Sequence, residues 1–404
     1  MSVGLIEPDM LLPIKGIRLA AVSAGIKKNQ NKDLVLIELA ENSTCAAVFT
    51  KNKFCAAPVI LAKKNIAAAS PRYLLINSGN ANAGTGKQGV EDANASCELV
   101  AKQTGCSAQE VLPFSTGVIG ESLPVEKIAM ALPSVFDLLA ENNWITAAYG
   151  IMTTDTKLKG ISRQFELQGK TVTITGLSKG AGMIQPNMAT MLAYVGTDAA
   201  IDQALLQECL QDAVSLSFNS ITVDSDTSTN DACVLMATGQ AGNSKLVEKN
   251  ADYLKLFNAV SEVCLYLAQA IIRDAEGATK FVTLQVASSA SLEDARQVAY
   301  TVAHSPLVKT ALFACDPNWG RILAAVGRAG VEFDMDKIRI YLGDVCIVSN
   351  GGRDPGYTEE QGQQVMNQDE ILIRIELNTG EYQASVWTSD LSYDYVKINA
   401  EYRS

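Results

Sequence analysis

The chain has 404 residues, with 33 Lys and Arg against 44 Asp and Glu and a formal net charge of −11. This length predicts two or three domains, and a composition of 48% hydrophobic and 19% charged residues indicates a globular protein rather than a disordered one. The basic residues are scattered along an acidic chain, which argues against nucleic-acid binding and favours small-molecule substrates.

Histidine and cysteine usage excludes several kinds of site. The single histidine, His304, rules out a multi-histidine metal site and leaves one candidate histidine base for a catalytic triad. The nine cysteines show no CxxC spacing, so we expect reduced thiols in the cytoplasm, with neither a zinc site nor disulfides. No stretch approaches 18 uninterrupted apolar residues, so we expect no membrane span. An enzyme of this composition is predicted to use a base other than histidine, and no metal.

The N-terminal part begins with strands and continues with helices. Alternating apolar residues at 34–39 predict strands within the first fifty residues. Apolar residues at helical spacing predict amphipathic helices over 90–101, 125–132 and 206–213. The segment 170–176 predicts a strand, and a glycine-dense loop follows it.

A longer amphipathic helix is predicted over 252–273, and a domain boundary is expected just beyond it. We predict an α/β sandwich domain over 1–280 and a sheet-rich C-terminal α/β domain over 281–404. Because strands and helices occur in groups rather than in strict alternation, the fold class is predicted to be α+β. A layered sandwich is favoured over a doubly wound parallel fold.

Strand patterns recur through the C-terminal domain. The first two are at 282–286 and 338–342. Two more, at 371–377 and 382–387, are separated by the turn Asn378-Thr379-Gly380, which predicts a hairpin between them.

The segment Ser178–Leu192 carries the most informative motif. Composition alone indicates a tight turn with a solvated lysine, because the phosphate-loop pattern GxxxxGK[ST] is absent. Residue by residue, however, SKGAGMIQPNMATML resembles the self-cleavage segment of the ornithine acetyltransferase (glutamate N-acetyltransferase) family of arginine biosynthesis. Seven further stretches resemble that family in the same order: Asn77–Ala83, Ser115–Gly120, Met152–Asp155, Thr222–Asp231, Glu276–Lys280, Asp316–Arg321 and Asn399–Ser404.

The resemblance implies that the chain cuts itself between Ala189 and Thr190, leaving processed chains 1–189 and 190–404. It also implies a layered αββα-type sandwich like that of N-terminal-nucleophile folds, with Thr116 and Gly117 as the oxyanion hole. Thr190 would then be both nucleophile and base, since its new α-amine titrates at about 7.7–8.0 and takes the proton of its own hydroxyl. The scarcity of histidine fits such a mechanism.

The resemblance further implies an acyltransferase that moves an acetyl group from N2-acetyl-L-ornithine to L-glutamate through acetyl-Thr190. Ornithine and N-acetylglutamate would be the products. No cofactor is required, and acetyl-CoA would be a co-substrate only in a bifunctional enzyme. The implied assembly is a heterotetramer of two N-terminal and two C-terminal fragments. The implied substrate contacts are Thr153, Lys179, Thr190, Glu276, Asn399 and Ser404.

Two other functions stay open at this point. An N-terminal-nucleophile aminopeptidase or amidohydrolase would use the same Thr190 but pass the acyl group to water. An unprocessed binding protein would not cleave itself at all. The carboxylate-rich stretch Thr222–Asp231 lacks the EF-hand positions, so we predict a capped turn or a supporting hydrogen-bond network there rather than a metal loop. For His304 we predict a structural role.

Overall fold

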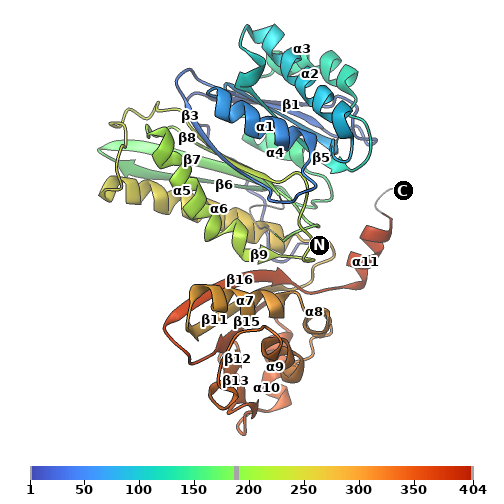
Figure 1. The fold of residues 1–404 in the computed structure, drawn as a ribbon, viewed down its shortest axis with the longest axis vertical. Helices are drawn as coiled ribbons and strands as arrows, with labels where there is room; N and C mark the ends of the chain where they lie inside the picture. The colour runs from blue at the N-terminus through green and yellow to red at the C-terminus, as the bar shows by residue number, and fades with distance from the viewer. Residues whose placement is uncertain (1, 186–190, 402–404) are drawn as a thin grey trace.

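The computed structural model describes residues 2–185 and 191–401. Its N-terminal part is built around two stacked sheets (Figure 1). The first sheet has the strand order β1-β2-β4-β5, with helices α1, α2 and α3 packed on its outer face. The bounds are β1 (Ile17–Val22), β2 (Leu34–Leu39), β4 (Tyr73–Asn80), β5 (Val111–Val118), α1 (Ala57–Ala68), α2 (Gly86–Thr104) and α3 (Val125–Asp137).

The second sheet has the strand order β3-β10-β8-β7-β6, and helices α5 and α6 cover its outer face. Among the described residues, α6 is the one helix long and apolar enough to cross a membrane by length and composition, yet half of its most apolar window is buried in the protein. The bounds are β3 (Thr44–Phe49), β6 (Lys159–Leu167), β7 (Lys170–Lys179), β8 (Leu192–Thr197), β10 (Ala232–Ala237), α5 (Gln203–Ser215) and α6 (Ala251–Arg273).

A continuous apolar core lies between the two sheets. Helix α4 (Trp144–Ile151) is inserted there and contacts strands of both sheets, with Trp144 fully buried. Phe114 on β5 and Tyr194 on β8 meet edge to face, with ring centroids 5.4 Å apart. Helix, sheet, sheet and helix therefore follow one another, and the predicted layered α+β sandwich is confirmed.

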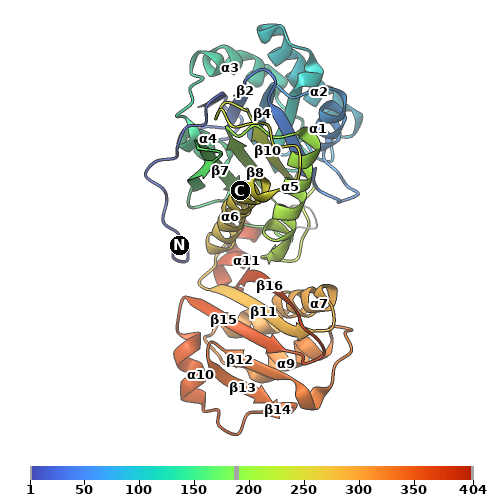
Figure 2. The same cartoon turned by 90° about the vertical axis from the view of Figure 1, so that its left-hand side faces the viewer.

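The C-terminal part has a sheet and a core of its own (Figure 2). The strand order is β14-β13-β12-β15-β11-β16-β9, and the edge strand β9 (Ile221–Thr222) comes from the N-terminal part of the chain. The division at 280/281 stays a prediction. The bounds are β11 (Phe281–Ser289), β12 (Arg339–Leu342), β13 (Val345–Ser349), β14 (Gly352–Arg353), β15 (Glu370–Glu376), β16 (Tyr382–Ser389), α7 (Leu292–Ala303), α8 (Pro306–Phe313), α9 (Trp319–Gly327) and α10 (Glu359–Met366).

The predicted hairpin between β15 and β16 is wrong. Strand β11 lies between them, parallel to β15 and antiparallel to β16. The turn instead wraps around the end of β11: Thr379 donates its N–H to the Ser288 carbonyl at 2.7 Å. A Cβ at Gly380 would lie 2.5 Å from the Ser289 carbonyl oxygen, so the glycine permits this close crossing. A turn motif predicts a change of chain direction, not which strand fills the space between.

Candidate active site

A cavity of about 300 Å³ lies where the ends of β5 and β7 meet the α6–β11 connection and the C-terminal helix. Its lining brings together residues that are far apart in the sequence. Each of the six predicted site residues that the structure describes lines this cavity, namely Thr116, Gly117, Thr153, Lys179, Glu276 and Asn399.

Three predicted site residues, Ala189, Thr190 and Ser404, lie outside the described residues. The cleavage position and the nucleophile therefore stay predictions. The next residue along the chain, Met191, lines the cavity, and Leu192 after it begins β8.

Gly117 lies at a point where two strands approach very closely. It pairs with Gly79 on β4 and has a φ of +135°. A Cβ at Gly117 would lie 2.3 Å from the carbonyl carbon of Gly79, so a side chain cannot be accommodated there. The predicted oxyanion turn thus depends on glycine for both its backbone conformation and its packing.

Lys179 and Thr116 are in direct contact. The Lys179 ammonium donates a hydrogen bond to Thr116 Oγ1 at 2.9 Å. Because this contact uses an oxygen lone pair, the hydroxyl hydrogen of Thr116 points elsewhere and is available to an oxyanion in the cavity. Burial lowers the pKa of Lys179, and the charge of Lys159 lowers it further, while Asp155, Asp231 and Glu276 partly offset these effects.

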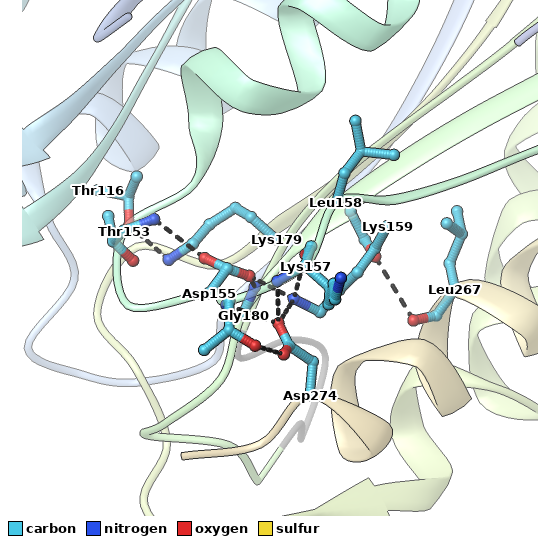
Figure 3. A network of polar contacts seen from close by, with 12 residues as sticks. Thr116, Thr153, Asp155, Lys157, Leu158, Lys159, Lys179, Gly180, Leu267 and Asp274 are labelled. Atoms are coloured by element: carbon cyan, nitrogen blue, oxygen red, sulfur yellow. Dashed lines mark hydrogen bonds and ion pairs between the residues drawn. The ribbon is translucent and has the colours of Figure 1, made fainter. Parts of the chain in front are cut away.

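Asp155 organises the segments on which two predicted substrate contacts lie (Figure 3). Its Oδ2 accepts the Thr153 N–H at 2.9 Å, and its Oδ1 accepts the Gly180 N–H at 2.7 Å. Burial would raise the pKa of Asp155, but the charges of Lys159 and Lys179 outweigh burial and hold this pKa well below its usual range. Asp155 is therefore a fixed anion.

Lys159 is the buried cation that balances this anion. Its Nζ lies 2.7 Å from Asp155 Oδ1 and 2.6 Å from Asp274 Oδ2, and the three charged side chains are almost fully buried. Burial would lower the pKa of Lys159, but the two carboxylates raise it. Asp274 also accepts the N–H groups of Thr156 and Lys157, at 2.9 and 3.1 Å. A closed charge network therefore supports one wall of the cavity.

Glu276 reaches the cavity from the connection that follows α6. It is 9% exposed, and its Oε2 accepts a hydrogen bond from Asn399 Nδ2 at 2.9 Å. Its backbone N–H donates to the Ala181 carbonyl at 2.9 Å. A Cβ at Gly182 would lie 2.3 Å from Glu276 Oε2, so the carboxylate fits only because residue 182 has no side chain.

Asn399 belongs to α11 (Tyr393–Ala400), which extends from the C-terminal part toward the sandwich (Figure 1). Ser392, the cap of this helix, donates its hydroxyl to the Gly277 carbonyl at 2.6 Å. A Cβ at Gly277 would lie 2.5 Å from the Tyr395 nitrogen, so glycine allows the helix to dock. The last helix of the chain thus completes the cavity.

The acidic stretch Thr222–Asp231 makes hydrogen bonds to the segment 183–185, as the predicted supporting network would. Asp224 accepts the backbone N–H groups of Met183 and Ile184, at 2.7 and 2.8 Å. His304 lies outside the cavity lining, and its Nε2 is 3.2 Å from Thr222 Oγ1. Burial lowers the pKa of His304 to about 4, helped by the charges of Lys309 and Arg328.

Sequence reasoning missed the supporting residues of the site. Asp155 and Asn230 lie inside motifs that carry the family resemblance, but the motifs by themselves indicate no role for either residue. Asn230 lines the cavity and donates to the carbonyls of Ala81 and Ser115, at 2.6 and 2.9 Å. No sequence motif includes Lys159 or Asp274, and no local pattern can relate two residues 115 positions apart.

Comparison with known proteins identifies the family. The sequence matches the ArgJ family over residues 18–404. It is 57% identical to the arginine biosynthesis bifunctional protein ArgJ of Pseudomonas fluorescens, covering 100% of both chains. It is 56% identical to the protein of the same name from Methylococcus capsulatus, over 98% of this chain and 97% of the relative.

Solved structures are also similar. The crystal structure of arginine biosynthesis bifunctional protein ArgJ from Bacillus halodurans is 40% identical, with a TM-score of 0.50, and covers 52% of this chain and 99% of that chain. Ornithine acetyltransferase from Mycobacterium tuberculosis, solved with ornithine, is 34% identical with a TM-score of 0.38, over 44% of this chain and 94% of that one. The resemblance seen in the motifs is confirmed: the chain belongs to the ArgJ family.

Proposed function

We propose that this protein transfers the acetyl group of N2-acetyl-L-ornithine to L-glutamate, in arginine biosynthesis, through an acetyl-enzyme on Thr190. One observation carries the proposal furthest. Six residues expected from widely separated motifs line a single cavity, and two of them, Lys179 and Thr116, are in contact. Membership of the ArgJ family supports the same reaction.

In the proposed mechanism, the Thr190 hydroxyl attacks the acetyl carbonyl while the Thr190 α-amine takes its proton. The Thr116 hydroxyl and the Gly117 N–H stabilise the negative charge that develops on the carbonyl oxygen. The C–N bond then breaks, the amine of ornithine takes up the proton, and the acetyl group remains as an ester on Thr190. Glutamate attacks this ester through its α-amine, which releases N-acetylglutamate and restores the hydroxyl.

Cleavage between Ala189 and Thr190 is part of this proposal, because the α-amine exists only after the chain is cut. The related Bacillus halodurans chain corresponds to about half of this one while matching nearly its own full length. Chains of about half length are what such a cut would produce. We propose that the fragments stay together as a heterotetramer of two copies of each, in the cytoplasm, without a bound cofactor. Acetyl-CoA is proposed as a second acetyl donor.

Intact-mass measurement of the purified protein before and after addition of acetylornithine tests this function. We expect two fragments, with an acetyl adduct on the fragment that begins at Thr190. Thr190→Ala should abolish both cleavage and adduct. A single uncut chain of 43.1 kDa would contradict self-cleavage. Release of free acetate in place of acetylglutamate would instead indicate the hydrolase.

A further inference from the structure

The proposed reaction poses a recognition problem. Its two amino acids share an α-carboxylate, but the side chain of ornithine ends in an ammonium and that of glutamate in a carboxylate. In the catalytic cavity, Lys179 suits the shared carboxylate, and the nearly buried Glu276 suits the ammonium. The same Glu276 would repel the side chain of glutamate. A cationic group elsewhere is needed for the acceptor.

A second cavity, of about 320 Å³, adjoins the first. The two cavities share Thr153, a predicted substrate contact. The second cavity is polar and contains two lysines. Its lining residues are Lys27, Asn29, Asn31, Lys32, Tyr149, Met152, Thr153 and Asp155.

The backbone holds Lys27 firmly at this place. Asp33 is fully buried and accepts the N–H groups of Ala24, Ile26 and Lys27, at 2.6, 2.6 and 2.9 Å. A Cβ at Gly79 would lie 3.0 Å from Lys27 Cγ, so the stem of Lys27 passes tightly over β4. Since Gly79 pairs with Gly117, Lys27 lies beside the predicted oxyanion turn.

Both lysines of this cavity donate hydrogen bonds to neutral carbonyl oxygens. Lys27 Nζ donates to the Lys32 carbonyl at 2.9 Å, and Lys32 Nζ donates to the Ala21 carbonyl at 3.1 Å. An ammonium has three N–H donors, so each lysine keeps donors for a ligand beyond these contacts. The carboxylate in the lining, Asp155, is already paired with Lys159. The cavity therefore carries net positive charge within a chain of charge −11.

Burial of Lys27 supports the same interpretation. Burial lowers its pKa to about 8, and the charge of Lys179 adds to that effect, while Asp33 and Asp155 partly offset it. A bound carboxylate would compensate for the lost hydration of this ammonium.

We propose that Lys27 and Lys32 form the subsite that binds the side-chain carboxylate of glutamate, entered from the catalytic cavity past Thr153. The ammonium of ornithine goes instead toward Glu276. This inference rests on the proposed function and adds to it a physical reason why one nucleophile serves two amino acids of opposite side-chain charge. The two half-reactions then use different distal subsites.

The two half-reactions can be measured separately. Lys27→Gln and Lys32→Gln are compared with Lys28→Gln, a control at an exposed lysine of the same loop that does not line the cavity. We expect Lys27→Gln to raise the KM for glutamate about 10-fold or more, as loss of a charged hydrogen bond implies. Acetyl-enzyme formation from acetylornithine should stay within about 2-fold of the wild-type rate. Lys28→Gln should behave as wild type in both steps.

Several results would overturn the proposal. One is a Lys27→Gln variant in which both half-reactions slow equally, or in which neither changes. Another is a rise in the KM for acetyl-CoA alone, which would assign the lysines to phosphate groups. If the wild-type protein forms no acetyl-enzyme from acetylornithine, the proposed function fails instead. Calorimetric titration with N-acetylglutamate then still tests the subsite, since Lys27→Gln should weaken that binding and Lys28→Gln should not.

Discussion

Two of the buried lysines, Lys159 and Lys309, lie in opposite electrostatic settings. Lys159, beside the candidate active-site cavity, contacts two carboxylates, at 2.7 and 2.6 Å, and its pKa is raised. Lys309, on α8 of the C-terminal part, contacts Thr388 Oγ1 at 2.9 Å and the Ser389 carbonyl. Burial lowers the pKa of Lys309 to about 8, and Asp390 and Asp224 offset this only in part.

The two settings show that the partners of a buried lysine decide whether its pKa rises or falls. Next to the cavity, the Lys159 ammonium pairs with two carboxylates. Asp155 in turn holds the backbone at Thr153 and Gly180, and Asp274 holds it at Thr156 and Lys157. In the C-terminal part, Lys309 donates its hydrogen bonds to neutral oxygens, so burial lowers its pKa. The charge of Lys309 also helps to lower the pKa of His304, which is about 4. The one histidine is thus neutral at physiological pH and does not line the candidate active-site cavity.

Replacing Lys159, the cation between two buried carboxylates, should have the largest effect on the free energy of unfolding. Lys159→Met leaves Asp155 and Asp274 buried without their partner, which we expect to cost about 3–5 kcal/mol of the free energy of unfolding. Urea unfolding measures this loss. Lys157→Met, at a partly exposed neighbour 3.9 Å from Glu7, is the control and should cost less than about 1 kcal/mol. Equal losses in the two variants would show that the buried ion pairs stabilise the fold no more than the partly exposed pair does.

In the C-terminal part, Lys309 should make the free energy of unfolding depend on pH in the alkaline range. Its pKa is lowered in the folded protein, so between pH 8 and 10.5 the unfolded state binds more protons and stability rises with pH. The free energy of unfolding of wild type, relative to that of Lys309→Met, should therefore increase by about 3 kcal/mol from pH 8 to pH 10.5. Denaturation at several pH values tests this. A constant difference would mean that Lys309 keeps an ordinary pKa.

His304 should give an effect of the same sign at acidic pH, and we expect a smaller one because this ring is only partly buried whereas Lys309 is buried. Its pKa is about 4 in the folded protein and 6.5 in its ordinary state, so stability falls as pH drops from 6.5 to 4. His304→Gln should lose less stability over that interval, and its acetyl-transfer rate at neutral pH should equal that of wild type. A large loss of activity would instead place His304 in the catalytic machinery.

The smallest effect is expected where a charge pair is exposed. Arg163 and Glu262 form an ion pair with side chains 42% and 56% exposed. Arg163→Gln should change the free energy of unfolding by less than about 1 kcal/mol, and salt should remove that difference. A loss comparable to that of Lys159→Met would mean that burial does not decide the strength of these pairs.

Much of the fold follows from local patterns. The helix expected over 252–273 is α6, at Ala251–Arg273, because its apolar stripe at helical spacing faces the sheet. Motifs also identified residues that line one cavity, among them Lys179, Glu276 and Asn399. These predictions succeeded because periodicity and motif chemistry are properties of short segments.

Other features could not be predicted in this way. The insertion of β11 between β15 and β16 depends on which strands pair, and a turn motif is silent on that. The partnership of Lys159 with Asp274 joins residues 115 positions apart in the sequence. The contact of the Lys27 stem with Gly79 likewise needs two loops to meet. The family, the element types and the candidate residues that line one cavity could all be predicted from sequence patterns. Which charges are buried together could be seen only in the folded chain, because burial and pairing depend on contacts between distant segments.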